Sequence, residues 1–164
     1  MFVRALMLRI PVALVAMCVV GAFLQGATAA KLETTPAIAA LLARGNAHEY
    51  RKQYDQAIFD FSEALLLKPS RHMAAELYGQ RGGEYVLKED FERAMADAEE
   101  AIRLAPNYFR GYQTRARLFM HRSQFDRAMA DINRAIQLQP DFSGLYVNRG
   151  NVLEAVRKVA FGGK

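Results

Sequence analysis

Small and apolar residues recur at helical spacing along most of the chain, and short polar breaks separate them at regular intervals. Ala57, Phe61 and Ala64 follow one another by four and three positions, which places them on one face of a helix. The same spacing of small residues returns from Ala94 and again from Ala128. A fixed period of about 34 residues is typical of an array of repeated helical pairs.

The pattern predicts seven helices. Prolines at 69, 106 and 140 close the second helix of each pair, because proline cannot continue a helix. Thr35 is expected as the N-cap of the first helix and Pro36 as its first helical residue. Three extra residues within 70–74 make the first period longer than the second. The expected helices are about 36–50, 54–67, 72–87, 91–104, 109–121, 125–138 and 143–158.

A second set of positions repeats with the first helices. An aromatic or leucine, an arginine, a small residue and then His, Tyr, Phe or Leu recur at fixed spacing. The four copies are Leu41-x-x-Arg44-Gly45-x-x-His48, Tyr78-x-x-Arg81-Gly82-x-x-Tyr85, Tyr112-x-x-Arg115-Ala116-x-x-Phe119 and Tyr146-x-x-Arg149-Gly150-x-x-Leu153. With the alanines and the closing proline, this pattern resembles the tetratricopeptide repeat (TPR) family, and exported bacterial members in particular. The sequence departs from the family in having no Trp, and in carrying arginine where the family has leucine before the glycine.

The resemblance implies an all-α fold, an α-solenoid of three helix-turn-helix repeats at about 38–71, 75–108 and 109–142 within a domain spanning 31–164. The helix at about 143–158 begins as a fourth repeat without a second helix, so it is expected to cap the array. Its apolar side then either faces solvent or is covered by a partner or a second copy of the chain.

Arginines and aspartates also follow the repeat. Arg44, Arg81 and Arg115 each precede an aspartate, Asp60, Asp97 or Asp131, by sixteen positions. We expect these charges to form a ladder of partly buried ion pairs between first and second helices. Pairing within each repeat leaves the arginine at 149 free, whereas pairing with the next repeat leaves the arginine at 44 free.

Residues 1–30 differ from the rest of the chain. Arg4 and Arg9 precede an apolar run over 10–24, which is followed by small residues up to Ala29 and Ala30. These are the three regions of a secretory signal peptide, and cleavage is expected after Ala29 or Ala30. The run is shorter than the roughly 20 residues that span a bilayer. A periplasmic or secreted protein is therefore expected, with an uncleaved signal anchor as the less favoured alternative.

Composition narrows the function class. The net charge is +5, and without the two leader arginines 20 Lys and Arg against 17 Asp and Glu leave +3, too weak an excess to indicate nucleic-acid binding. The single cysteine, Cys18, lies in the leader. The three histidines have no partners at metal-ligand spacing, and no nucleophile or phosphate-loop motif occurs. We expect no catalytic activity, no cofactor and no metal.

The resemblance further implies that first helices line a concave face that binds a peptide or protein segment. Seven residues are expected there: Asn46, Tyr50, Gly83, Arg110, Gln113, Arg117 and His121. Gly79 and Gly83 remove side chains from one helix face, either to admit a ligand backbone or to allow tight packing. Chaperone-binding members hold a C-terminal carboxylate with a Lys, Asn and Arg set, of which only Asn46 and Arg110 match, so that activity is not assigned. The basic residues favour a peptide with acidic or carboxylate character.

The function predicted from sequence is therefore a non-catalytic scaffold that binds a protein segment outside the cytoplasm. The alternative is a self-associating structural protein, a homo-oligomer that pairs through the last helix.

Overall fold

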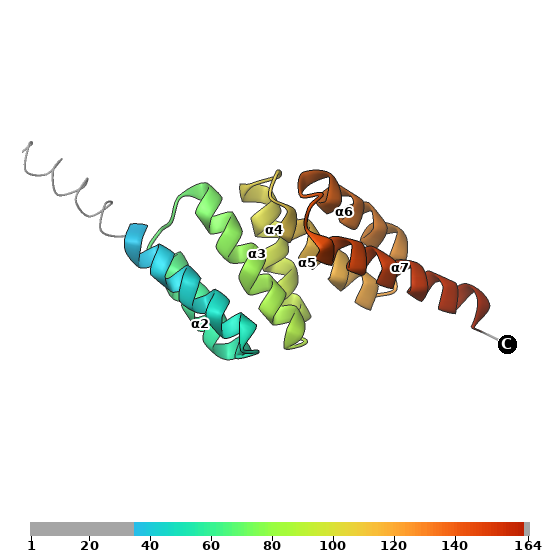
Figure 1. The fold of residues 1–164 in the computed structure, drawn as a ribbon, viewed down its shortest axis with the longest axis horizontal. Helices are drawn as coiled ribbons and strands as arrows, with labels where there is room; N and C mark the ends of the chain where they lie inside the picture. Colours follow the sequence, from blue (N-terminus) through green and yellow to red (C-terminus); the bar gives the residue numbers. More distant parts are fainter. Residues whose placement is uncertain (1–34, 163–164) are drawn as a thin grey trace, which may run out of the picture. The chain divides into compact units, whose positions relative to one another are not determined.

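A computed structural model describes residues 35–162, and these residues contain helices and short turns without any strand. The first helix covers residues 35–50, and six more follow it (Figure 1). These are α2 (Tyr54–Leu66), α3 (Arg71–Leu87), α4 (Phe91–Leu104), α5 (Phe109–His121), α6 (Phe125–Leu138) and α7 (Ser143–Phe161). The predicted all-α fold of three helical pairs followed by one further helix is confirmed. The expected leader, residues 1–30, lies outside the described residues.

Helix ends agree with the sequence pattern to within one residue at most positions, with differences at both ends of the array. Thr35, expected as an N-cap, is already inside the first helix. The last helix runs to Phe161, three residues beyond the expected end, because no helix breaker occurs before Gly162.

The three extra residues near position 70 lengthen the start of α3. The N-cap Ser70 accepts a hydrogen bond from the Met73 amide, and α3 has 17 residues where α5 has 13. The added turn carries Arg71, whose guanidinium donates to the carbonyl oxygens of Leu104 and Arg103 at 2.7 and 3.2 Å. Arg71 of α3 therefore satisfies carbonyl groups at the C-terminus of α4 that have no partner inside α4.

Each helical pair turns through the same backbone motif. Lys52, Glu89 and Ser123 adopt positive φ angles of 60°, 61° and 56°. The amide of the next residue returns to a carbonyl five positions back: Gln53 to His48, Asp90 to Tyr85 and Gln124 to Phe119, at 2.8–2.9 Å. This is the Schellman ending of a helix, here made by residues other than glycine. The motif fixes the point at which each chain reversal occurs.

The core is built from the small residues of the repeat. Ala57, Ala94 and Ala128, like Ala64, Ala101 and Ala135, are fully buried. Consecutive helices pack against one another along the array, and first helices also contact first helices, α3 with α5 and α5 with α7. No helix among residues 35–162 is long and apolar enough to cross a membrane.

The arginine–aspartate ladder exists, and it pairs residues within each repeat. The guanidinium to carboxylate distances are 2.6 Å for Arg44–Asp60, 2.8 Å for Arg81–Asp97 and 2.8 Å for Arg115–Asp131. The aspartates are buried, with 2%, 5% and 7% of their surface exposed. Arg149 is then left without an acidic partner among the described residues, as the first of the two pairings predicts.

Candidate functional site

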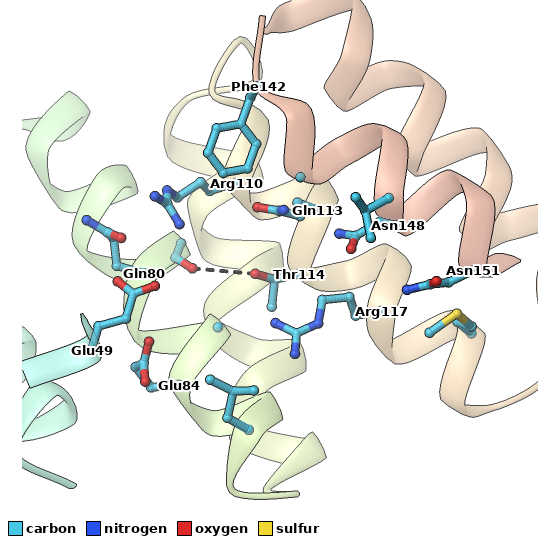
Figure 2. Close-up of a pocket in the computed structure, with 16 residues that line it drawn as sticks. Glu49, Gln80, Glu84, Arg110, Gln113, Thr114, Arg117, Phe142, Asn148 and Asn151 are labelled. Atoms are coloured by element: carbon cyan, nitrogen blue, oxygen red, sulfur yellow. Dashed lines mark hydrogen bonds between the residues drawn. The ribbon is translucent and has the colours of Figure 1, made fainter. Parts of the chain in front are cut away.

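A groove of about 520 Å³ lies along the first helices of the array, between residue 49 and α7. Four of the seven residues predicted from sequence line it: Gly83, Arg110, Gln113 and Arg117. The close-up shows Arg110, Gln113 and Arg117 along the groove with Glu49, Gln80, Glu84, Thr114, Phe142, Asn148 and Asn151 (Figure 2). The groove is open to solvent and carries charges of both signs.

The other three predicted residues lie elsewhere. Asn46 is at the edge, where its side-chain oxygen accepts a 2.9 Å hydrogen bond from Gln80, a groove residue. Tyr50 is 90% exposed and does not line the groove. His121 stacks on Phe91 with ring centroids 4.0 Å apart, because the last turn of α5 faces the start of α4. The structure therefore places Tyr50 and His121 outside the groove.

The groove follows the repeat period. One row of equivalent repeat positions in the groove consists of Gly83, Arg117 and Asn151, and a second consists of Gln80, Thr114 and Asn148. Because first helices lie side by side, residues at one repeat position form a stripe across the array. Gly83 is the member of its row without a side chain, so the stripe leaves open space at α3.

The two glycines of α3 have different roles. A Cβ on Gly79 would lie 3.0 Å from Arg110 Cβ and 3.1 Å from Tyr108 Cε1, so glycine there allows α3 and α5 to pack closely. A Cβ on Gly83 would have nothing within 4 Å. Packing therefore explains Gly79, and Gly83 opens into the groove.

We expect Gly83→Ala to stabilise the fold by about 0.5–1 kcal/mol, since alanine is the better helix former and no atom obstructs its methyl group. Gly82→Ala is the matched control on the adjacent residue. Its Cβ would lie 3.2 Å from Asp97 Cβ and 3.3 Å from Thr114 Cγ2, so this variant should lose stability. Urea unfolding followed by circular dichroism measures both. Equal effects from the two alanines would contradict the assignment of Gly83 to the groove.

Glu84 lies at the floor of the groove with 2% of its surface exposed. It occupies the repeat position at which Leu118 of α5 and Val152 of α7 are buried in the core. Its Oε2 atom has no hydrogen-bond partner among the described residues. Burial, together with the nearby Glu49, raises the pKa of the Glu84 carboxyl to about 7, although Arg117 and Arg110 oppose the shift.

Two arginines face this acid. In Figure 2, Arg117 lies across the groove from Glu49 and Glu84. Burial lowers the pKa of the Arg117 guanidinium, and the two glutamates counteract that shift. Arg110 lies 5.7 Å from the ring centroids of both Phe109 and Phe142, in the range of cation–π contacts. Both arginines thus lie in a groove whose central acid has a raised pKa.

Nothing in the described residues points to metal chemistry, since no group of three or more His, Cys, Asp or Glu side chains is placed to hold an ion. Six residues that line the groove were not predicted from the sequence: Gln80, Glu84, Thr114, Phe142, Gly144 and Asn148. Two signals were present: polar residues recurring once in each repeat, and a glutamate at a repeat position that is apolar in the later copies.

Comparison with known proteins decides the family. Tetratricopeptide repeat profiles match residues 38–71, 75–108 and 109–142. The chain belongs to the tetratricopeptide repeat family. The matched segments have the same bounds as the three repeats expected from the sequence.

Curated relatives match this TPR array over less than half of the chain. Small glutamine-rich tetratricopeptide repeat-containing protein 2 of Saccharomyces cerevisiae is 35% identical over 72 residues, 44% of this chain and 20% of that protein. Human serine/threonine-protein phosphatase 5 is 37% identical over 76 residues, 46% of this chain and 15% of the phosphatase. The chain thus spans at most a fifth of the length of these two eukaryotic relatives.

Solved TPR domains share the fold. The Sgt2 TPR domain from Aspergillus fumigatus superposes with a TM-score of 0.66 at 20% identity, covering 79% of this chain and 85% of that one. The first TPR domain of Spaghetti (RPAP3), solved with the HSP90 peptide SRMEEVD, has a TM-score of 0.64 at 21% identity, covering 74% and 96%. In that neighbour a TPR array of this architecture is bound to the HSP90 peptide.

Proposed function

We propose that this TPR array is a non-catalytic module that binds an extended peptide or protein segment in the groove between residue 49 and α7. The observation that carries the proposal is the groove itself, which is open and is lined by polar side chains from successive first helices. A stripe of hydrogen-bonding groups at repeat spacing suits a chain that runs across the helices. The peptide complex of a neighbour with this architecture supports the assignment.

The preferred segment has acidic or carboxylate character. Arg110 and Arg117 supply charge-assisted donors to an incoming carboxylate. Glu49 and Glu84 stand against this preference, but Glu84 is largely uncharged below pH 7 because of its raised pKa. A buried acid that is neutral in the empty groove can itself donate a hydrogen bond to an anionic ligand.

A peptide array graded from basic to acidic sequences tests this preference. The Arg110→Gln plus Arg117→Gln variant should lose at least tenfold in affinity for acidic peptides, because it removes two charge-assisted donors. Arg122→Gln plus Arg134→Gln is the matched control, since both of these arginines are exposed and outside the groove. An acidic preference that survives in the first variant would contradict the role of Arg110 and Arg117. Absence of binding to any peptide would instead contradict the module's function.

We also propose that the array works outside the cytoplasm, in the periplasm or after secretion, with residues 1–30 as a cleaved signal peptide. The charged start, apolar run and small residues before Ala29 and Ala30 support this proposal. The remaining chain has no cysteine, which suits an oxidising compartment. N-terminal sequencing of the exported protein should begin at residue 30 or 31, whereas an intact N-terminus on a membrane-bound protein would indicate an anchor.

A further inference from the structure

The last helix, α7, carries the residues with which the first helix of a repeat packs against its second helix. Tyr146, Arg149 and Gly150 stand at the repeat positions of Tyr112, Arg115 and Ala116. Arg149 lies 5.2 Å from the Tyr146 ring centroid, as Arg115 lies 5.8 Å from that of Tyr112. The arginine of α7 is therefore held on its tyrosine in the same way as in the preceding repeat.

In the complete repeats this face is covered by the second helix of the pair. Arg81 donates two hydrogen bonds of 2.8 Å to Asp97 in α4, and a Cβ on Gly82 would lie 3.2 Å from Asp97 Cβ. One turn further on, Tyr85 and Phe119 pack on the alanines of the second helices and are 7% and 5% exposed. Each covering helix thus supplies an aspartate to the arginine and small residues to the close contact.

On α7 nothing described covers the same positions. No carboxylate among residues 35–162 pairs with Arg149, and a Cβ on Gly150 would have nothing within 4 Å. Leu153, at the position of Tyr85 and Phe119, is 56% exposed, and Val156 is 41% exposed. The face therefore combines an unpaired cation, a site without a side chain and an apolar strip, in the geometry that receives a helix elsewhere in the chain.

We propose that this face of α7 binds an amphipathic helix of a partner protein that carries the pattern Ala-x-x-Asp-apolar-x-x-Ala. The aspartate of that helix pairs with Arg149. Its apolar residue lies on Gly150, as Phe61 lies on Gly45, and its first alanine lies on Leu153, as Ala94 lies on Tyr85. The pattern is that of this chain's own second helices: Ala57-x-x-Asp60-Phe61-x-x-Ala64, Ala94-x-x-Asp97-Ala98-x-x-Ala101 and Ala128-x-x-Asp131-Ile132-x-x-Ala135.

A second copy of the chain fits this face less well. The single acid of α7 is Glu154, which already pairs with Lys158 at 2.7 Å, so two α7 helices offer Arg149 no free aspartate. The described second helices are also in use, because Asp60, Asp97 and Asp131 are buried against their own arginines. A helix of a partner protein can supply the free aspartate that a second copy of this chain lacks.

This surface is separate from the groove. Val147, Asn148 and Asn151 of α7 line the groove, whereas Tyr146, Arg149, Gly150 and Leu153 do not. One helix thus presents two surfaces, an inner one for an extended segment and an end surface for a helix. The two should bind their ligands independently.

The probe for this surface is a synthetic peptide with the sequence of residues 123–141, held helical by a staple between positions 133 and 137. Both of those positions are exposed in α6, so the staple does not disturb the interacting face. Fluorescence anisotropy measures its binding to residues 31–164, a segment that contains every core cluster of the array. We expect saturable binding.

Replacement of Asp131 by asparagine in the probe, or Arg149→Gln in the protein, should each weaken binding about tenfold. Combining the two should add little, because both remove one ion pair. Gly150→Leu should abolish binding, since its side chain fills the site of closest approach. The Arg110→Gln plus Arg117→Gln groove variant should bind the stapled peptide unchanged.

Melting curves show that each protein variant is folded, which is expected because the altered residues lie on an uncovered face. Equal affinity of Arg149→Gln and Gly150→Leu with the unaltered chain would overturn the proposal, as would absence of saturable binding to the folded chain. Sedimentation that shows a dimer abolished by Leu153→Glu would assign the face to a second copy and also overturn it. Loss of groove binding alone would leave this result standing.

Discussion

Asp97→Ala should lower the free energy of unfolding by about 3–5 kcal/mol, because it leaves the buried Arg81 guanidinium without its counter-charge. Asp97 is 5% exposed, and the Arg81 side chain is only 18% exposed. Arg81 also donates to Ser62 Oγ at 3.0 Å, which ties the second repeat to α2. The pair therefore lies at the contact between repeats, where water cannot readily replace the lost carboxylate.

The same substitution at Asp60 should cost less. The Arg44 side chain is 57% exposed, so its guanidinium can turn to solvent when the carboxylate is removed. Asp141→Ala, which removes an exposed acid in the turn before α7, should change stability by less than about 0.5 kcal/mol. The order Asp97, Asp60, Asp141 in urea denaturation is the expected result.

A double replacement separates the ion pair from simple loss of packing. If the uncompensated charge causes the loss, then Arg81→Leu together with Asp97→Ala should be more stable than Asp97→Ala alone, since no buried charge is left. If the double variant loses the sum of the two single effects, the two side chains act independently and the interpretation of the ladder as coupled pairs fails.

Much of this fold could be predicted because its elements repeat. Each helix alone is short and weakly determined, but Ala57, Ala94 and Ala128 recur at nearly equal spacing with the prolines that follow, and this fixes both register and pairing. The ladder was visible for the same reason, as a constant separation of sixteen positions. The two possible pairings, within a repeat or with the next repeat, differ only in three-dimensional packing, which the repeat period does not specify.

The groove was predicted less completely, for a physical reason. Its lining depends on which side of each first helix remains uncovered after these helices pack side by side. The rotation of each helix about its own axis decides this, and the repeat period does not specify that rotation. Tyr50 and His121 were placed in the groove from their position along a helix, yet Tyr50 points to solvent and His121 stacks on Phe91. Glu84 was missed because its repeat position is a core position in the later copies, where an acid is not expected.

That unusual position makes Glu84→Gln the second substitution with a large expected effect. The pKa of Glu84 is about 7 in the folded chain against an ordinary 4.5. A carboxyl with a raised pKa binds its proton more tightly in the folded state, so folding loses stability as pH rises from about 4.5 to 7 and stays lower above it. The shift corresponds to about 3 kcal/mol at most.

Glutamine cannot ionise, so the variant should escape this loss. The quantity to compare is the unfolding free energy of Glu84→Gln minus that of the unaltered chain. This difference should be about 2–3 kcal/mol larger at pH 8 than at pH 4. Other titrating groups cancel because both proteins carry them, and the constant cost of burying an amide cancels between the two pH values. A flat difference for Glu84 would contradict its raised pKa.

The same proton links stability to binding. An acidic segment held by Arg110 and Arg117 brings negative charge toward Glu84, which favours the protonated form and raises its pKa further. Binding then takes up protons, and affinity for an acidic peptide should fall roughly threefold to tenfold between pH 6 and pH 8. A basic peptide should show the opposite trend, because a cation favours the ionised carboxylate. Titrations at both pH values with Glu84→Gln should remove both trends, and the sign found with the unaltered chain identifies the charge that the groove is built to hold.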